Sequence, residues 1–141
     1  MGFAQPASAS AVSTFGTDAG GWTVVTSYPL GGLSTPQGTA TWNSTGGNPG
    51  GYVSTTDPNT DDTYFAAPAA FLGNHKAALN GTISFDRIMT AGAIDYSVNY
   101  DIVLRGDGIT LRYDLPLPSK LNTWETYSAT LSPGAGWVNN G

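Results

Sequence analysis

The segment Gly46–Val53 constrains the fold of this chain more than any other, because four glycines enclose an Asn-Pro pair within it. Glycine adopts positive φ at little steric cost and proline holds φ near about −65°, so the pattern predicts a tightly folded turn. We expect Gly50 or Gly51 to have positive φ just before a strand begins. The aromatic-rich run Tyr64–Asn74 follows a short loop later and should be held against a core.

Glycine and proline punctuate the whole chain, with 19 Gly and 9 Pro in 141 residues, and only 11% of the residues are charged. This composition is typical of a turn-rich all-β protein. The length suits one domain with a single core. We divide the chain into a flexible leader at 1–13 and one β-domain at 14–141. Ala7 and Ala9 resemble a signal-peptide cleavage site, although no charged or apolar region precedes them; the alternative is a small-residue leader without that role.

Alternation between apolar and polar side chains marks the expected strands. The clearest alternation covers 98–105 and 109–114, with Arg105–Gly108 as the hairpin connection between them. Short β-branched or aromatic segments predict further strands near 22–28, 39–42, 51–55, 83–86 and 127–131. Pro29–Gly38 is expected to be a loop, and 71–78 to hold at most one helical turn. About eight short strands result, which is the pattern of an antiparallel β-sandwich or jelly roll.

The aromatic side chains have two interpretations. Most of those on alternating strands should point into the core, and we place there Trp22, Phe65, Phe85, Tyr100 and Trp124. Trp42, Tyr52 and Tyr64 instead flank the glycine-rich turns, where a binding edge could form. Partly exposed Trp and Tyr rings can stack on the faces of sugar rings, as they do in jelly-roll carbohydrate-binding modules. A carbohydrate-binding module is therefore one alternative function.

The charges exclude several classes of partner. The net charge is −5 and the five Lys and Arg residues are scattered singly, so no basic stripe is available for nucleic acid or an anionic membrane. No window approaches the run of about 18 apolar residues that a membrane-spanning helix needs, so no membrane insertion is expected. Cysteine is absent, which removes disulfides, thiolate nucleophiles and cysteine-built zinc sites.

Catalytic residue types are scarce. His75 is the sole histidine and stands beside Lys76 in a polar turn, where we expect an exposed loop residue. Glu125 is the only glutamate and has no acidic neighbour, whereas glycoside hydrolysis needs two carboxylates across one sugar. No nucleophile elbow, zinc-binding helix motif or phosphate-binding glycine loop occurs. We therefore predict that the protein is not an enzyme, with a hydrolase as the less favoured alternative.

An acidic loop holds oxygen ligands at alternate positions, Asp57, Asn59 and Asp61, followed by Asp62. Such alternation suits a hard cation such as Ca²⁺. An EF-hand is excluded, because Pro68 stands where that loop requires a bidentate glutamate. Two interpretations stay open. The loop is either a calcium site of another type with these four residues as ligands, or an Asx-turn loop whose side chains bond to their own backbone.

Six motifs follow one another along the chain: Gly46–Val53, Tyr64–Asn74, Gly81–Asp86, Asp101–Pro116, Trp124 with Tyr127, and Gly136–Trp137. In this order they resemble the laminin B domain, also called laminin IV type A, in a bacterial style. The resemblance runs from Phe15 onward and implies a β-sandwich of jelly-roll type, similar to galactose-binding-like folds. It also implies a non-catalytic structural or adhesive module, secreted or on the cell surface. Its partners would be glycans or proteins of the extracellular matrix or cell surface.

The resemblance also implies a missing segment. The family continues past the pair that matches Gly136–Trp137 into a closing segment with an Asp-Asn pair, which this chain lacks. We therefore expect one sheet to lack its last strand. An unpaired strand edge is a template for strand addition by another chain, so self-association through that edge is predicted.

Overall fold

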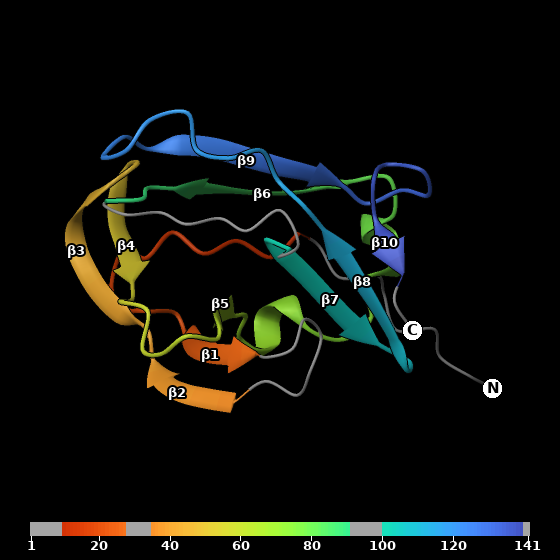
Figure 1. The fold of residues 1–141 in the computed structure, drawn as a ribbon, viewed down its shortest axis with the longest axis horizontal. Coiled ribbons are helices and arrows are strands. Elements are labelled where there is room, and N and C mark those ends of the chain that lie inside the picture. Colours follow the sequence, from red (N-terminus) through yellow and green to blue (C-terminus); the bar gives the residue numbers. More distant parts are fainter. Residues whose placement is uncertain (1–9, 28–34, 91–99, 140–141) are drawn as a thin grey trace.

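The computed structural model describes residues 10–27, 35–90 and 100–139. They form ten short strands and two single turns of 3₁₀ helix, and every strand pair among them is antiparallel (Figure 1). In chain order the elements are β1 (Thr23–Ser27), β2 (Thr35–Thr39), β3 (Thr41–Gly47), β4 (Gly50–Ser54), β5 (Asp62–Ala66), η1 (Ala69–Phe71), η2 (Lys76–Ala78), β6 (Thr82–Arg87), β7 (Ile102–Gly106), β8 (Ile109–Tyr113), β9 (Glu125–Thr130) and β10 (Val138–Asn139). The predicted all-β class is confirmed.

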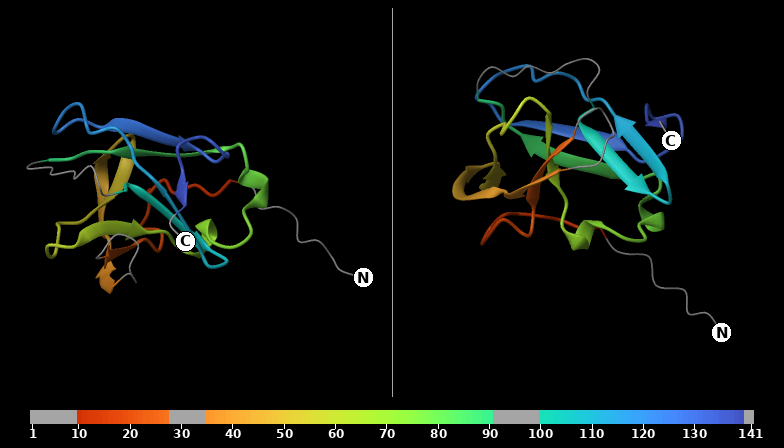
Figure 2. Two further views of the ribbon diagram at one scale, coloured as in Figure 1. Left: turned by 45° about the vertical axis from the view of Figure 1, so that its right-hand side comes forward. Right: turned by 60° about the horizontal axis from the view of Figure 1, so that its bottom comes forward.

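Four small sheets make up an open sandwich (Figures 1 and 2). The β6–β9 pair lies opposite the three-stranded sheet in the order β2–β1–β5. The β3–β4 hairpin closes one end, and the β10–β8–β7 sheet crosses the other end. The two opposed layers come from different halves of the sequence, so they are joined by residues far apart in the chain.

The glycine-rich turn is built as the sequence predicts. Asn48 and Pro49, joined by a cis peptide bond, connect β3 to β4, and Gly50 has a φ of 83°. Gly51 has no positive φ. A Cβ built on Gly51 would overlap the carbonyl oxygen of Phe15 and come within 2.9 Å of that of Asn43. Glycine at 51 is therefore required by a close approach of backbones.

Aromatic contacts hold the segment that precedes β1. The Trp22 ring packs edge-on against Phe15 and Phe71, with centroid distances of 6.3 and 5.2 Å. Its Nε1 donates a hydrogen bond to Ser13 Oγ at 2.8 Å. Ser13 is the last residue of the expected leader, so this end of the leader contacts the domain. Residues 1–9, with the signal-peptide motif, lie outside the described ranges.

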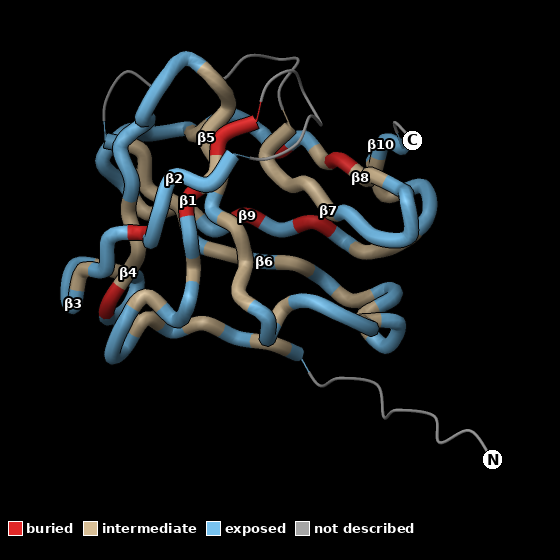
Figure 3. The backbone as a smooth tube through the Cα atoms, turned by 90° about the horizontal axis from the view of Figure 1, so that it is seen from below, coloured by how far each residue is buried: buried red, intermediate tan, exposed pale blue. Residues whose placement is uncertain are grey.

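Few of the described residues are buried (Figure 3). The buried apolar residues are Val24, Ala40, Leu115, Tyr127 and Ala129. Of the aromatics predicted in the core, four are half-buried: Trp22, Phe85, Tyr100 and Trp124. The prediction is wrong for Phe65, which is 42% exposed. On β5 the neighbouring Tyr64 is the more buried ring, and period-two alternation turns Phe65 to the opposite face.

The largest departure from the predicted strands is β2. Most of it lies in the expected loop Pro29–Gly38, yet Thr35–Thr39 pairs with β1. All five residues of β2 are exposed, so its backbone hydrogen bonds and not an apolar pattern define it. The described residues therefore hold ten strands where about eight were expected. The single helical turn expected within 71–78 is η2, and η1 is a further turn that begins earlier, at Ala69.

The β7–β8 hairpin is confirmed. Asp107 and Gly108 form its two-residue turn with φ values of 50° and 75°, as in a type I′ turn. After Gly136–Trp137 the short strand β10 pairs with β8. Self-association through an open strand edge stays a prediction. Within the described ranges, no helical element has the length and apolar character to cross a bilayer.

Candidate functional site

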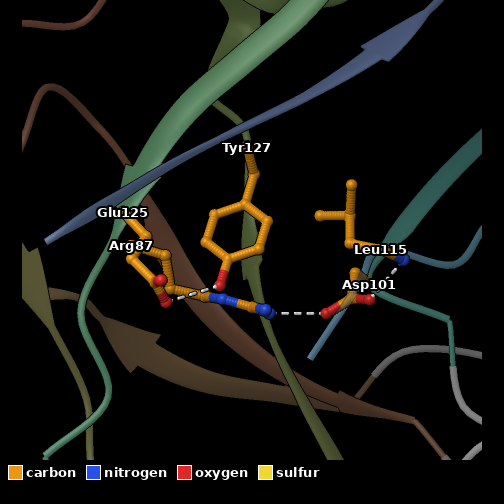
Figure 4. A network of polar contacts seen from close by, with 5 residues as sticks. All are labelled: Arg87, Asp101, Leu115, Glu125 and Tyr127. Carbon is orange, nitrogen blue, oxygen red and sulfur yellow. Dashed lines mark hydrogen bonds and ion pairs between the residues drawn. The ribbon is translucent and has the colours of Figure 1, made fainter. Parts of the chain in front are cut away.

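A polar network joins the β6–β9 pair to the β7–β8 hairpin (Figure 4). Arg87, the last residue of β6, donates from Nη1 to Asp101 Oδ1 at 2.5 Å. The other carboxylate oxygen of Asp101 accepts the backbone N–H of Leu115 at 2.8 Å. Asp101 precedes β7 and Leu115 follows β8, so one carboxylate closes the base of the hairpin and ties it to β6. We call the set Arg87, Asp101, Leu115, Glu125 and Tyr127 the arginine junction.

Tyr127 is the centre of this junction. The Arg87 guanidinium lies 4.3 Å from the centroid of the Tyr127 ring, a cation–π geometry, and Phe85 stacks nearby at 6.1 Å. The Tyr127 hydroxyl donates to Glu125 Oε2 at 3.1 Å. Glu125 also accepts the backbone N–H of Ser119 at 3.0 Å and the Ser119 hydroxyl. The hydrogen bonds from Ser119 hold the pKa of Glu125 below its ordinary value.

Arg87 keeps its charge in this setting but does not satisfy all its donors. Burial lowers the pKa of Arg87, but the Tyr127 hydroxyl and Asp101 raise it more, so it lies above its ordinary value. Nε and Nη2 of Arg87 are buried and have no hydrogen-bond acceptor in the described part of the chain.

Tyr64 lies on β5 near a second group of charges. Burial raises the pKa of Tyr64 to about 12, and the carboxylates of Asp62 and Asp101 add to the rise. Arg112 and Arg105 oppose it, which places Tyr64 within electrostatic reach of β7 and β8. Arg112 is buried, with its guanidinium 5.6 Å from the Tyr100 ring. A charged side chain therefore lies on the buried face of β8.

The structure does not bring the three candidate sugar-binding aromatics together. Trp42 is paired with Val53 and Tyr52 with Asn43, so Trp42 and Tyr52 point to opposite faces of the β3–β4 hairpin. Tyr52 packs edge-on against Trp124, with centroids 5.5 Å apart. Tyr64 belongs to a different sheet. Sugar binding stays a prediction, and a platform shared by all three rings is not formed.

The side chains of all four tryptophans instead form hydrogen bonds to other residues of the chain. Each indole N–H donates to an oxygen at 2.7 to 2.9 Å: Trp22 to Ser13 Oγ, Trp42 to Phe15 O, Trp124 to Gly46 O and Trp137 to Thr130 O. Two of these bonds flank the close approach at Gly51. We call the set Phe15, Trp42, Gly46, Gly51 and Trp124 the glycine junction.

The acidic loop shows the hydrogen bonds of Asx turns. Asp57 Oδ1 accepts the backbone N–H of Asn59 at 3.3 Å and the Thr63 hydroxyl at 2.8 Å. Asn59 Oδ1 accepts the backbone N–H of Asp61 at 2.8 Å. Asp62, the fourth candidate ligand, is the first residue of β5. These contacts favour the Asx-turn interpretation, and calcium binding stays a prediction.

The residues considered for catalysis lie apart. His75 precedes η2, and its Nε2 lies 3.2 Å from the carbonyl oxygen of Leu72. Glu125 belongs to the arginine junction at the start of β9. Across residues 10–27, 35–90 and 100–139, no group of three His, Asp or Glu side chains is arranged to hold a metal ion.

The sequence reasoning missed the arginine junction. Asp101 and Arg112 occupy the polar positions of the predicted alternation, which a half-buried strand turns to solvent. In the structure Arg112 is buried, and the Asp101 side chain is only 10% exposed. The chain has only three arginines, and all lie at the end of β6 or on β7 and β8. The clustering of all three arginines on these strands is the sequence feature that could have indicated the arginine junction.

Comparison with known proteins adds a family. A model of the family Laminin B (Domain IV) matches residues 64–141, more than half of the chain. Laminin subunit gamma-2 of Equus caballus is 30% identical over 83 residues, which are 55% of this chain and 7% of that protein. Laminin subunit gamma-2 of Homo sapiens is 32% identical over 82 residues, with the same coverage. The match thus spans a small part of those curated relatives. No solved structure matches the chain significantly.

Proposed function

The chain belongs to the Laminin B (Domain IV) family, and on that premise we propose that it is a non-catalytic structural module that acts outside the cell. It is secreted or displayed on the cell surface, where it adheres to proteins of the extracellular matrix or of other surfaces. This proposal rests on one observation. All four indole N–H groups donate hydrogen bonds to other residues of the same chain. Aromatic groups at both junctions, and charged groups at the arginine junction, hold distant segments together.

A structural role explains the chemistry of these groups. An indole or a carboxylate that bonds to another segment favours one arrangement of loops and strands over others. Glu125 receives three hydrogen bonds and its pKa is lowered, which is opposite to the raised pKa of a general acid. These contacts support a scaffold over a hydrolase.

The carbohydrate-binding alternative rests on Trp42, which is 38% exposed. Two variants separate the two functions. Trp42→Phe keeps an aromatic face but loses the bond to Phe15, so the structural role predicts a loss of about 1 kcal/mol of stability. Trp42→Ala removes the face that would stack on a sugar.

The experiment measures binding of the purified chain to a glycan array and to immobilised matrix proteins, with turnover of chromogenic esters and glycosides alongside. We expect saturable binding to a matrix protein, no turnover, and no glycan binding that depends on Trp42. Glycan binding that survives Trp42→Phe and disappears in a folded Trp42→Ala would replace the structural proposal with the carbohydrate-binding one.

A further inference from the structure

A cleft opens beside the segment that leads into β1. It has a volume of about 220 Å³ and lies between residues 12–20 and residues 68–71, which include η1. This volume is below the roughly 300–1,000 Å³ of a pocket for a drug-sized ligand and above the roughly 150 Å³ cavity that holds a benzene ring. The cleft, which we call the N-terminal cleft, therefore has room for about one large side chain.

Two phenylalanine rings line the N-terminal cleft and are held in place. Phe15 and Phe71 are half-buried, and each packs edge-on against Trp22. Trp22 is itself fixed by its hydrogen bond to Ser13. The backbone N–H of Phe71 donates to the carbonyl oxygen of Pro68 at 2.9 Å. The two rings therefore form an apolar wall that exists before any ligand binds.

The backbone of Phe15 adopts a conformation that aromatic residues rarely have. Its φ is 52°, in the left-handed region where the Cβ comes close to the following carbonyl oxygen. The Phe15 carbonyl oxygen accepts the Trp42 indole N–H at 2.8 Å and lies against the bare Cα of Gly51. The glycine junction thus holds Phe15 in a strained conformation, and such residues are concentrated at ligand-binding sites.

Asp18 gives the cleft its charge. Among the described residues that line the cleft, Asp18 is the only one with an ionisable side chain, and it is exposed. Its Oδ1 accepts the backbone N–H of Gly20 at 2.7 Å, which orients the carboxylate but uses one of about four lone-pair sites. A negative charge beside aromatic walls is complementary to a cationic group on an apolar stem.

Arginine fits this combination better than lysine does. A planar guanidinium stacks on an aromatic ring and donates two parallel bonds to a carboxylate, whereas an ammonium group is a compact and strongly hydrated charge. The ring contacts matter, because an exposed ion pair alone contributes little. None of the five Lys and Arg residues of the chain lines the cleft, so the cation has to come from another molecule.

We propose that the N-terminal cleft binds an arginine side chain of the protein to which the domain adheres. The guanidinium pairs with Asp18, and its stem and face lie against Phe15 and Phe71. Arginine is also among the residues that carry most of the binding energy in protein interfaces. The proposal rests on the adhesive function proposed above and adds the residue that the partner presents.

Nuclear magnetic resonance tests the cleft with Nα-acetyl-arginine amide and with its uncharged analogue, Nα-acetyl-citrulline amide. The Gly20 amide signal reports binding directly, because this N–H bonds to the Asp18 carboxylate. At constant ionic strength we expect a saturable shift, with half-saturation by the arginine compound about tenfold below that by the citrulline compound. Equal half-saturation by the two compounds, or no saturable shift, would overturn the proposal. Equal half-saturation by Nα-acetyl-lysine amide would overturn the choice of arginine.

Two matched pairs of variants locate the site, all at exposed positions where the fold should be kept. Asp18→Asn should raise the half-saturation concentration about tenfold, and Asp107→Asn in the β7–β8 turn should not change it. Ala69 and Ala70 are neighbours on η1, and of the two Ala70 lines the cleft. Ala70→Tyr should therefore abolish the shift, and Ala69→Tyr should retain it. Equal effects within either pair would overturn the assignment to the cleft.

The Ala70→Tyr chain also separates this proposal from the function on which it rests. We expect it to lose binding to the immobilised matrix protein, with Ala69→Tyr unaffected. Undiminished binding of Ala70→Tyr to that protein would overturn the arginine proposal and leave the adhesive function standing. A native chain that binds the arginine compound but no matrix protein would overturn the adhesive function and retain the cleft as an arginine site.

Discussion

At the glycine junction, β3–β4 is held by backbone close approach and by indole N–H groups, all of them neutral. At the arginine junction, β6–β9 is held to β7–β8 by a guanidinium, two carboxylates and a phenol. The two junctions join the same sandwich at different places but depend on different variables. We therefore expect the first to be sensitive to added volume and the second to be sensitive to a change in charge.

The largest effect should come from one methyl group in the glycine junction. Gly51→Ala places a Cβ against two backbone carbonyl oxygens, which cannot move as a side chain could. We expect the free energy of unfolding to fall by about 3 kcal/mol, at the upper end for overpacking. Urea denaturation measures it.

Gly106→Ala is the matched control for that change. Gly106 is also a strand residue, and a Cβ built on it meets nothing within 4 Å. A change of less than about 0.5 kcal/mol is expected there. Equal losses in both variants would show that the contact of Gly51 with Phe15 is not what requires glycine.

The second-largest effect should come from removing the negative charge of the arginine junction. Asp101→Asn keeps an acceptor for the Leu115 N–H but leaves the half-buried Arg87 without its counter-charge. We expect a loss of about 2 kcal/mol, less than the cost of breaking a fully buried pair. Asp107→Asn in the exposed β7–β8 turn is the control and should stay within about 0.5 kcal/mol of the native chain. If Asp101→Asn is as mild as the control, charge does not hold this junction.

Alkaline pH should reveal the charge of the arginine junction, because Asp101 contributes to the raised pKa of Tyr64. Burial raises the pKa of Tyr64 in the folded chain from its ordinary value of 10.0 to about 12. The resulting stability is complete below pH 10 and is lost as pH rises towards 12, because only the unfolded chain ionises readily in that window. Absorbance near 295 nm should show one late-ionising tyrosine, absent in Tyr64→Phe. The stability of the native chain should fall relative to Tyr64→Phe between pH 10 and pH 12, and a constant difference would contradict the assignment.

Calcium should have the smallest effect, because the acidic loop lies outside both junctions. A calcium site filled at a hundred times its Kd would add about 2.7 kcal/mol and raise the melting temperature by several degrees. Asp57 and Asn59 already accept bonds from the loop itself, so a cation has to displace them. We expect a shift below about 1 °C between millimolar calcium and chelator. A shift of several degrees that disappears in Asp57→Asn would establish the calcium site.

The local parts of the fold were predictable and the distant contacts were not. Gly50 and the Asp107–Gly108 turn follow from residues adjacent in sequence, since turn geometry depends on only a few φ values. The exposed strand β2 depends on its pairing with β1 and has no apolar pattern of its own. Arg87 and Asp101 meet only because two sheets pack against each other. The alternation of apolar and polar residues therefore could not predict that these two polar side chains are largely buried.

The candidate ligand residues show the same limit. Oxygen spacing along the acidic loop is equally compatible with a cation and with Asx turns, and only the hydrogen bonds of Asp57 and Asn59 distinguish the two. The positions of Trp42 and Tyr52 relative to the turn could be read from the sequence. Their opposite orientations required the register of β3 against β4.

The pairing of β6 with β9 has a consequence for the order in which the chain acquires its structure. Thr82 pairs with Thr130, and the Trp124 bond reaches back to Gly46, 78 residues earlier. Closing such loops costs more entropy than closing the two-residue turns of β3–β4 and β7–β8, so the hairpins should form first. During synthesis from the N-terminus, β6 then emerges well before its partner strand. Its half-buried Phe85 stays without Tyr127 until β9 arrives, and β6 is the strand that a chaperone or a neighbouring nascent chain would meet unpaired.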